Sequence, residues 1–327
     1  MNDQMTFADI ERSAAKVTKR EQFLADMEAV VPWEKWLDLI EPFYPDTDGK
    51  RGRHARGLEK MLRMYLLQTW FSLSDEAVED NIYDSYSMRK FVGVDLLEET
   101  APDAVTLLRF RHLLEVNGLQ KKMFEELRKE LERRNYIVKT GTIVDATIIA
   151  ASSSTKNKRK ERDRYMRSTK KNNNWFFGFK SHIGVDEETG MVHTNEITPA
   201  NVSDVEMGAK LLHGEEKEVF GDSGYLGIQT KDGAPQNVEY RITARPGQTR
   251  RIQDEESRTR QTEIERAKCS IRAKVEHAFQ IIKTVFCFRK TRYKGEKKNA
   301  ALMHILYASV NLVKLSRLTK GAVCQKA

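Results

Sequence analysis

Apolar residues recur at intervals of three and four through roughly the first 135 residues, which is the spacing of amphipathic helices. The pattern is clearest from Leu58 to Phe71. After it, Ser74 precedes Asp75 and Glu76, which is typical of a helix with an N-cap and an acidic first turn. The spacing predicts helices over residues 20–31, 33–43, 58–71, 75–83, 103–114 and 119–134. We therefore expect residues 1–135 to form an all-helical N-terminal domain.

After the helical part, the pattern changes to strands. The stretch Thr140–Ala150 is rich in β-branched residues and predicts a strand with Asp145 in its middle. Residues 152–174 are polar and basic, which is typical of a mobile loop or of a solvated excursion. Ser203 and Glu206 have the spacing of a capping box at a helix start. Further strands are predicted over 175–185, 191–198, 217–221 and 237–243, and helices over 204–212, 263–285 and 299–315.

The order of these elements indicates the fold. Three antiparallel strands, followed by strands that alternate with helices, match the ribonuclease H-like fold, an α/β class with a mixed sheet. It should occupy a domain over residues 139–318, followed by a short basic tail at 319–327. In that fold the first and fourth strands are neighbours, so Asp145 and Asp222 should lie side by side. The long helix should bring Glu276 to the same place.

Three converging carboxylates suit divalent cations. A carboxylate inside an apolar strand needs a partner or a cation; the alternative is an exposed Asp145 on an edge strand. Two cations held by such a cluster activate the attacking and leaving oxygens of a phosphoryl transfer, and oxygen ligands favour Mg²⁺, with Mn²⁺ as a substitute. The histidines are scattered and the cysteines form no paired motif, so zinc is not indicated. The chain also lacks a glycine-rich phosphate loop, so no nucleotide cofactor is expected.

The charge of the chain favours a phosphate-rich partner, since the formal net charge is +8 and the sequence pI is about 9.2, although many basic proteins bind no nucleic acid. Three cysteines without a pairing framework suit a reducing compartment. No basic-then-apolar leader follows Met1, and no apolar run approaches the length of a membrane span. We therefore expect a soluble protein that is neither secreted nor membrane-bound.

The stretch CSIRAKVEHAFQIIK, residues 269–283, allows two interpretations. Arg272, Glu276 and Lys283 follow at intervals of four and seven, which places them on nearly one line along a helix, beside its apolar stripe. One interpretation is an exposed helix with ordinary ion pairs between successive turns. The other is a metal-binding carboxylate flanked by cations that hold a polyanion.

The three carboxylates resemble the DDE triad of bacterial transposases, and the chain is more narrowly similar to the insertion-sequence-five family. That family's signature is Tyr, two residues, Arg, three residues, Glu, six residues and Lys. Arg272, Glu276 and Lys283 have this spacing, whereas Cys269 stands at the Tyr position and Ala278 where the family normally has Pro. Other stretches similar to the family are MTFADIE at 5–11, IEPFYP at 40–45, MLRMYLLQTWFSLSD at 61–75, LRFRHLLE at 108–115, GTIVDATII at 141–149, FGFKSHIGVD at 177–186, PANVSD at 199–204 and GDSGYLG at 221–227.

The resemblance implies a transposase that binds the terminal inverted repeats of its own element, cleaves at the element ends and joins them to target DNA. It implies Mg²⁺-dependent chemistry in which Asp145, Asp222 and Glu276 are both the catalytic and the metal-binding residues. The implied partners are double-stranded DNA and further copies of the chain, in a homodimer or larger synaptic complex. The implied location is the bacterial cytoplasm, at the nucleoid. Two alternatives share the fold: a DNA-binding protein that has lost catalysis, and a nuclease for repair or RNA substrates.

DNA contacts are expected at several places. Arg272 and Lys283, on the line of Glu276, should contact phosphates near the scissile bond. The N-terminal helices should recognise the terminal repeat, the alternative being that they only pack or dimerise. Lys180 and His182 are candidates to face the site, although His182 has the alternative of a packed strand residue. The further candidates for phosphate contact are Lys180, Arg51, Arg53, Arg56, Lys158, Arg159 and Lys160.

Overall fold

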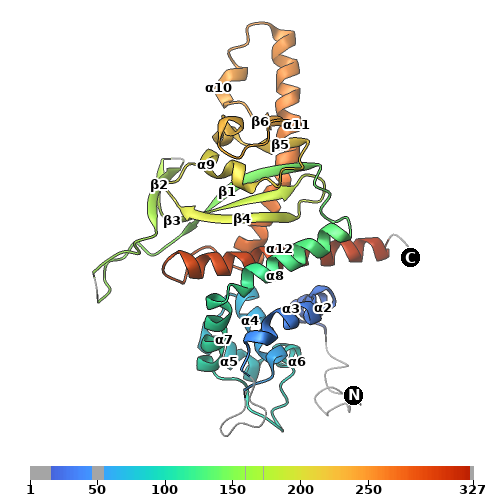
Figure 1. The fold of residues 1–327 in the computed structure, drawn as a ribbon, viewed down its shortest axis with the longest axis vertical. Coiled ribbons are helices and arrows are strands. Elements are labelled where there is room, and N and C mark those ends of the chain that lie inside the picture. Colours follow the sequence, from blue (N-terminus) through green and yellow to red (C-terminus); the bar gives the residue numbers. More distant parts are fainter. Residues whose placement is uncertain (1–15, 46–54, 159, 172, 325–327) are drawn as a thin grey trace.

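The computed structural model describes residues 16–45, 55–158, 160–171 and 173–324. The N-terminal part is helical, as the apolar spacing predicts (Figure 1). Its described helices are α2 (Lys19–Val30), α3 (Trp33–Ile40), the short 3-10 turn η1 (Glu41–Phe43), α4 (Leu58–Trp70), α5 (Asp75–Asp84), α6 (Tyr86–Val92), α7 (Ala104–Val116) and α8 (Leu119–Arg133). Trp36 and Trp70 are almost fully buried between them and are the largest side chains of this core.

Side-chain caps determine where several of these helices begin. Ser74 Oγ accepts a hydrogen bond from Ala77 N at 3.1 Å, which confirms the predicted start of α5. Asp103 Oδ1 accepts from Thr106 N at 2.6 Å at the start of α7. The seven-residue helix α6 was not predicted, because it is too short to show a periodic pattern. It ends at Gly93, whose φ of 75° is readily available only to glycine.

A six-stranded mixed sheet follows the helices. Its strands are β1 (Gly141–Ala150), β2 (Arg167–Lys171), β3 (Asn174–Asp186), β4 (Val192–Pro199), β5 (Glu218–Gly221) and β6 (Glu239–Ile242). The strand order is β2-β3-β1-β5-β6, and β4 also pairs with β3. β1 is antiparallel to β3 and parallel to β5. This is the predicted ribonuclease H-like arrangement, with the first strand in the middle of the sheet.

The two faces of the sheet have different covers. Ile143 and Ile183 belong to the main core, together with the long helices α11 (Glu255–Gln280) and α12 (Glu296–Cys324). Val144 instead belongs to a smaller core on the other face, under α9 (Asp204–Gly208). Adjacent strand residues point to opposite faces, so α11 and α12 cover one face and α9 covers the other.

Two predictions about polar segments are wrong. The stretch 152–174 is not a loop throughout, because residues 167–171 form β2 and pair with β3. This strand is polar on both faces, so it lacks the alternation that would predict it. Ser203 makes no side-chain cap, and α9 gives way to a 3-10 turn (Ala209–Leu211) after five residues.

Two predictions about long helices also need correction. α11 begins at Glu255, earlier than predicted, after Asp254 Oδ2 accepts from Ser257 N at 2.7 Å. α12 continues to Cys324, so the described part of the expected basic tail is helical. No helix within the described ranges is both long and apolar enough to cross a membrane.

α12 connects the N-terminal helices to the sheet. Trp70 Nε1 of α4 donates to Ser309 Oγ at 2.9 Å, and the hydroxyls of Tyr307 and Ser181, in β3, lie 2.7 Å apart. The side-chain amide of Asn311 bonds to both backbone groups of one β4 residue at 2.7 and 2.8 Å. Figure 1 shows α12 between the helical part and the sheet. One continuous core therefore includes both parts of the chain.

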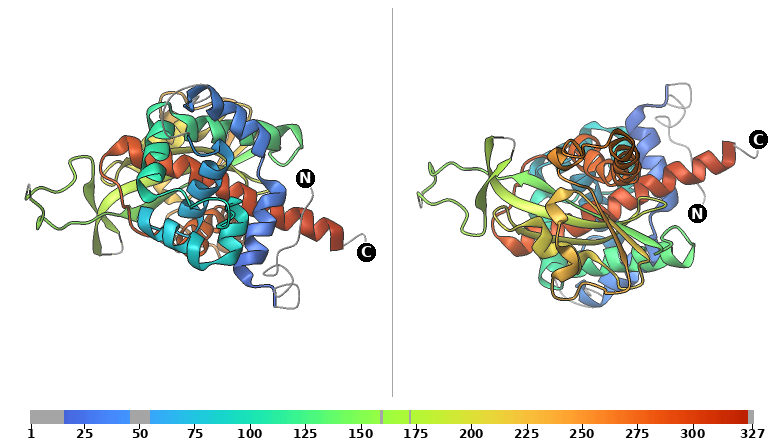
Figure 2. Two further views of the ribbon diagram at one scale, coloured as in Figure 1. Left: turned by 90° about the horizontal axis from the view of Figure 1, so that it is seen from below. Right: turned by 90° about the horizontal axis from the view of Figure 1, so that it is seen from above.

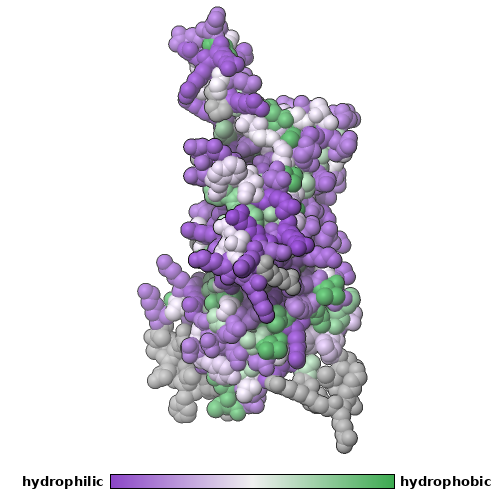
Figure 3. All heavy atoms as spheres, turned by 90° about the vertical axis from the view of Figure 1, so that its left-hand side faces the viewer, coloured by the Kyte–Doolittle hydropathy of each residue, from purple (hydrophilic) through white to green (hydrophobic). Residues whose placement is uncertain are grey.

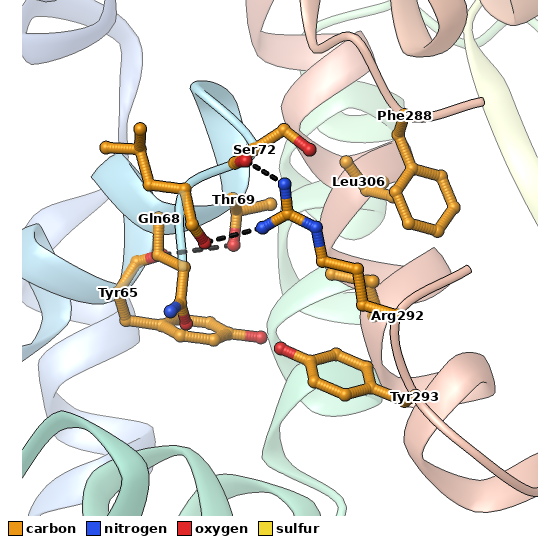
Figure 4. Close-up of a pocket in the computed structure, with 10 residues that line it drawn as sticks. Tyr65, Gln68, Thr69, Ser72, Phe288, Arg292, Tyr293 and Leu306 are labelled. Atoms are coloured by element: carbon orange, nitrogen blue, oxygen red, sulfur yellow. Dashed lines mark hydrogen bonds between the residues drawn. The ribbon is translucent and has the colours of Figure 1, made fainter. Parts of the chain in front are cut away.

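A second connection lies in the segment between α11 and α12 (Figure 4). Arg292 donates to the carbonyl oxygens of Ser72 and Leu73, which follow α4, the second at 2.6 Å. The guanidinium of Arg111, in α7, lies 5.1 Å from the ring centre of Tyr293. The cavity between these elements has a volume of about 20 Å³, enough for about one water molecule. It is a packing gap and not a ligand site.

β2 and the first part of β3 form a hairpin that projects from the body of the protein (Figures 1 and 2). β1 ends opposite Gly178, so residues 174–177 of β3 pair with β2 alone. Figure 2 shows the hairpin and the preceding loop on one side of the molecule, and the end of α12 on the other. The hairpin is therefore accessible to a large partner.

Candidate active site

The parallel pairing of β1 with β5 brings Asp145 and Asp222 together. The register pairs Ile143 with Phe220. Two residues further along each strand stand Asp145 and Asp222, the second just beyond the end of β5. The sequence-based expectation that these carboxylates are neighbours therefore agrees with the strand register. β1 lies between β3 and β5, so the alternative of Asp145 on an edge strand is wrong.

Asp145 is a mostly buried carboxylate, with a side chain that is 15% exposed. Its Oδ1 accepts from Ala146 N at 2.7 Å, and its Oδ2 lies 3.2 Å from Nη1 of Arg272. Burial raises the pKa of Asp145 to about 6, and the charge of Asp222 acts in the same direction, against the Ala146 hydrogen bond and the charges of Arg272 and Lys171. A carboxylate in this environment gains from an added cation.

Asp222 stands in a tight turn after β5. Its Oδ1 accepts from Gly224 N at 2.8 Å and so caps a short 3-10 turn. A side chain at position 224 would meet Asp222 Oδ1 at 2.9 Å, so glycine keeps this approach to the carboxylate open. Tyr225 is fully buried, and its hydroxyl has no hydrogen-bond partner among the described residues. Burial raises the pKa of Tyr225 well above its ordinary value, and the charges of Asp145, Asp204 and Asp222 add to this effect.

α11 brings Glu276 close to Asp145 through Arg272. The Nη2 atom of Arg272 lies 3.1 Å from Glu276 Oε1, while its Nη1 atom contacts Asp145. Arg272 therefore bridges two of the three predicted carboxylates. The side chain of Glu276 is 59% exposed, whereas that of Arg272 is only 23% exposed. The ordinary pair between helix turns is present, but the same arginine also reaches the sheet, so the helix is more than an exposed surface.

After α11 the chain forms a π-helical turn (Ile281–Val285) that carries Lys283. Such turns are frequent at functional sites. The ammonium of Lys283 donates to Thr147 Oγ1, two residues after Asp145 on the same face of β1. Burial lowers the pKa of Lys283, and the positive charges of Lys171 and Arg289 lower it further. Arg272 of α11 and Lys283 of the π-turn thus both contact β1, while their contact with phosphates stays a prediction.

The carboxylates do not form a closed metal site. Among the residues that the structure describes, no group of three or more His, Cys, Asp or Glu side chains is arranged to hold a metal ion. The guanidinium of Arg272 lies between Asp145 and Glu276 and neutralises part of their charge. Three oxygen donors fit Mg²⁺ or Mn²⁺ chemically, but such an ion needs Arg272 to move away.

Lys180 and His182, both on β3, were predicted to face the site, but both side chains bond to other residues of the protein. Lys180, 12% exposed at its side chain, lies 2.9 Å from Asp204 Oδ1 and donates to the carbonyl oxygen of Val202 at 2.8 Å. His182 is fully buried and lies 2.8 Å from Thr198 Oγ1, so its alternative interpretation as a packed residue is right. The prediction that Lys180 contacts DNA needs correction, because its charge is already paired.

None of the remaining predicted contacts that the structure describes is bonded to the three carboxylates. Arg56 Nη2 donates to Thr100 Oγ1 at 2.8 Å, and its Nη1 lies 3.6 Å from Glu99. It is therefore held within the helical part. Lys158 and Lys160 are exposed on the loop before β2. Three other predicted contacts lie outside the described residues: Arg51, Arg53 and Arg159.

Sequence reasoning missed several charged groups beside the site. Lys171, at the end of β2, and Arg289, after the π-turn, are close enough to influence the pKa of Lys283. Asp204 pairs with Lys180 near the Asp222 turn. Asp204 had a signal, because it ends the family-like stretch PANVSD. Lys171 and Arg289 had no such signal in the sequence. Their positions depend on the pairing of β2 with β3 and on the course of the chain after α11.

Two family descriptions match the sequence. "Transposase DDE domain" matches residues 137–312, and "Transposase domain (DUF772)" matches residues 11–113. A solved structure, "Cryo-EM structure of piggyBac transposase synaptic complex with hairpin DNA (SNHP)", is similar with a TM-score of 0.46 and 12% identity, over 91% of this chain and 74% of that chain. The DDE match spans more than half of the chain and includes β1, β5 and α11, with all three carboxylates. The chain therefore belongs to the DDE transposases.

Proposed function

We propose that this transposase binds the terminal inverted repeats of an insertion sequence, cleaves DNA at the element ends and joins them to target DNA by metal-dependent phosphoryl transfer. The observations that support the proposal best are that the strand register brings Asp222 beside Asp145, and that Arg272 links Asp145 to Glu276 of α11. The net charge of +8 suits double-stranded DNA as the partner. A homodimer or larger complex would hold the two ends of one element together.

Mg²⁺ is the proposed cofactor, with Mn²⁺ as a substitute, since DDE transposases generally use divalent metal ions. Asp145, Asp222 and Glu276 would hold the ions through carboxylate oxygens. When bound, the ions polarise the attacking oxygen and stabilise the leaving oxygen of the phosphoryl transfer. The raised pKa of Asp145 fits this role, because an added positive charge offsets the cost of keeping a buried carboxylate ionised.

Arg272 and Lys283 would position the DNA backbone beside the carboxylates. Arg272 is held by Asp145 and Glu276, and a metal ion on these carboxylates would displace its guanidinium, which would then be free to bind a phosphate beside the metal site. Lys283 is half-buried within the electrostatic reach of Lys171 and Arg289, so a phosphate there relieves the repulsion among three like charges. Both residues set the register of the backbone and leave sequence recognition to other residues.

Recognition of the terminal repeat is assigned to the helices α2–α8, as a domain that precedes the catalytic one. The family match over residues 11–113 and the basic sequence that contains Arg51 and Arg53 support this assignment. α5, which follows the turn at Ser74, is an unsuitable recognition helix. Its sequence DEAVEDNIYD carries five acidic residues and no basic one. Base contacts are therefore assigned to other segments of this region.

The test is cleavage of a labelled element end by the purified protein in Mg²⁺. Asp145→Asn, Asp222→Asn and Glu276→Gln should each reduce cleavage and strand transfer below detection, because each removes a ligand charge and little volume. End binding should change less than about twofold, since none of the three contacts DNA bases. Asp232→Asn, which removes an exposed carboxylate elsewhere in the same domain, is the matched control. Wild-type cleavage by any one of the three variants would remove that residue from the site.

Metal substitution separates the competing functions. Mn²⁺ should support cleavage, while Ca²⁺ should support assembly on DNA with little cleavage, because its looser coordination misplaces the reacting oxygens. Full activity in EDTA contradicts the mechanism. Binding without cleavage in Mg²⁺ identifies a DNA-binding protein, and cleavage without preference for an element end identifies a nuclease.

A further inference from the structure

The hairpin formed by β2 and residues 174–178 of β3, called here the basic hairpin, exposes an aromatic side chain. Trp175 is 72% exposed and Phe176 is 37% exposed. The other tryptophans, Trp33, Trp36 and Trp70, are half-buried or buried in the helical part. A single exposed apolar side chain is common on protein surfaces, so Trp175 indicates a contact surface only together with the charge around it. Figure 3 views the molecule from the side of the basic hairpin and shows hydrophilic residues over most of that face.

The basic hairpin carries only positive charge. Its sequence, RSTKKNNNWFFG, contains three cations and no acidic residue. Lys170 pairs directly with Trp175 across the two strands, so their side chains lie on the same face. Neither Lys170 nor Lys171 has an ion pair with a carboxylate of the described chain, whereas Arg56, Lys60 and Arg63 of the helical part are all paired. An anionic partner is therefore favoured over an apolar protein surface.

The basic hairpin also lies near the carboxylates. Lys171, next to its tip, is close enough to act on the charges of both Asp145 and Lys283. The segment that carries Arg289 runs beside the end of β1, where Thr291 N donates to Ala150 O at 2.8 Å. Lys171 therefore places one positive charge near the carboxylates, while its neighbour Lys170 shares the face of Trp175 on the same hairpin.

We propose that the basic hairpin is a single-strand clamp, in which Lys170 and Lys171 hold the backbone of an unpaired DNA strand and Trp175 stacks on one of its bases. This inference rests on the proposed function, because the strand it would hold is the opened end of the element next to the cleaved bond. Cations and an exposed aromatic ring on one hairpin are the two components of single-strand binding sites. In a closed duplex the faces of the bases are covered by their neighbours, so Trp175 distinguishes open from paired ends.

The experiment titrates the full-length protein in Ca²⁺ with two DNA probes of equal length. One is a blunt duplex and the other ends in a short unpaired oligothymidylate strand. Trp175→Ala should weaken binding of the unpaired end at least about fivefold, the effect of losing one base stack, and change blunt-duplex binding less than about twofold. The unpaired end should also quench tryptophan fluorescence in the wild type, and Trp175→Phe should abolish this quenching while keeping most of the affinity.

The matched control is Leu97→Ala, which removes a side chain that is 90% exposed on the helical part. It should bind both probes like the wild type. Equal losses on the two probes, or quenching that persists in Trp175→Phe, would overturn the single-strand assignment. Sedimentation gives a second test. If Trp175→Ala changes the oligomeric state and leaves DNA binding unchanged, the exposed surface binds a second copy of the chain and the single-strand assignment is wrong.

These readouts separate the inference from the proposed function. The binding and fluorescence measurements do not depend on cleavage. They therefore keep their meaning even if the carboxylate variants still cleave DNA. If cleavage depends on the three carboxylates but Trp175→Ala binds both probes normally, only the clamp is wrong.

Discussion

The positive charges of the N-terminal helices and those of the basic hairpin have different surroundings. In the helices, Arg63 lies between Glu28 and Glu59 and stacks 4.0 Å above the ring of Trp33. On the hairpin, Lys171 has no described carboxylate partner and instead adds to the positive field around the active site. The first arrangement stabilises the fold, and the second leaves charge available to a ligand.

This contrast shows that basic residues in a sequence do not by themselves identify a DNA-binding surface. Arg56, one of the predicted phosphate contacts, is paired within the helical part, and so is the nearby Arg63. A nearby acidic residue three or four positions away, such as Glu59 beside Arg63, is a sequence signal of such engagement. The four predictions below test the contrast.

The largest effect is expected for Arg111→Ala in the helical part. Arg111 is buried, lies 3.1 Å from Asp75 and 3.0 Å from Gln68, and packs on Tyr293. Its removal leaves Asp75 without its cation, so the free energy of unfolding should fall by about 3–5 kcal/mol. Urea denaturation measures this loss. The exposed Arg109→Ala on the same helix should stay within about 0.5 kcal/mol of wild type, and similar stability of both variants would contradict a structural role for Arg111.

The next effect concerns the cations near the carboxylates. The double variant Lys171→Ala and Lys283→Ala should reduce the slope of log affinity against log salt by about 1.8, roughly 0.9 for each lost phosphate contact. Stability should not fall, because the two ammonium groups repel each other in the absence of DNA. Gel-shift titrations at several salt concentrations give the slope. An unchanged slope would mean that these lysines do not contact the backbone.

Asp145→Asn should make the metal-free protein more stable. A carboxyl whose folded-state pKa is about 6, above its unfolded value near 4, binds more protons when folded, so its contribution to stability falls as pH rises between these values. The variant removes this cost. We expect its free energy of unfolding to exceed that of the wild type by about 1–2 kcal/mol at pH 7.5 and by almost nothing near pH 4. Urea denaturation in EDTA at both pH values checks this. A variant that is less stable at pH 7.5 would show that the Arg272 contact outweighs burial.

The smallest effect is expected for Arg51→Ala combined with Arg53→Ala. If the N-terminal region recognises the terminal repeat, this variant should lose about three- to tenfold in preference for the repeat over scrambled duplex, at one salt concentration. Arg56→Ala should change the preference little, because Arg56 is paired with Glu99. An equal loss of affinity for both duplexes would limit these arginines to phosphate contact.

Local patterns predicted most of the fold correctly. The β-branched run placed β1 within one residue, and Ser74 gave the start of α5, because each depends on neighbouring residues alone. The nearness of Asp145 and Asp222 followed from strand order, which has few alternatives in this fold. These features carry the family assignment.

The failures of prediction depend on tertiary contacts. β2 has no alternation of its own and exists because β3 extends past the end of β1. The spacing of Arg272 and Glu276 suggested phosphate contact, but no local pattern indicates that Arg272 also bridges to Asp145. Lys180 was assigned to DNA because Asp204, its partner, is 24 positions away in the sequence.

The position of α12 has a consequence for synthesis of the protein. Ribosomes make this helix after all the other described elements, yet Trp70 of α4 and Ser181 of β3 both depend on it for their hydrogen bonds. Until α12 leaves the ribosome, the helices and the sheet each expose the apolar surface that it covers, so neither can complete its core. A stop codon or frameshift before α12 should therefore yield a misfolded chain prone to proteolysis, and not a shorter DNA-cutting enzyme.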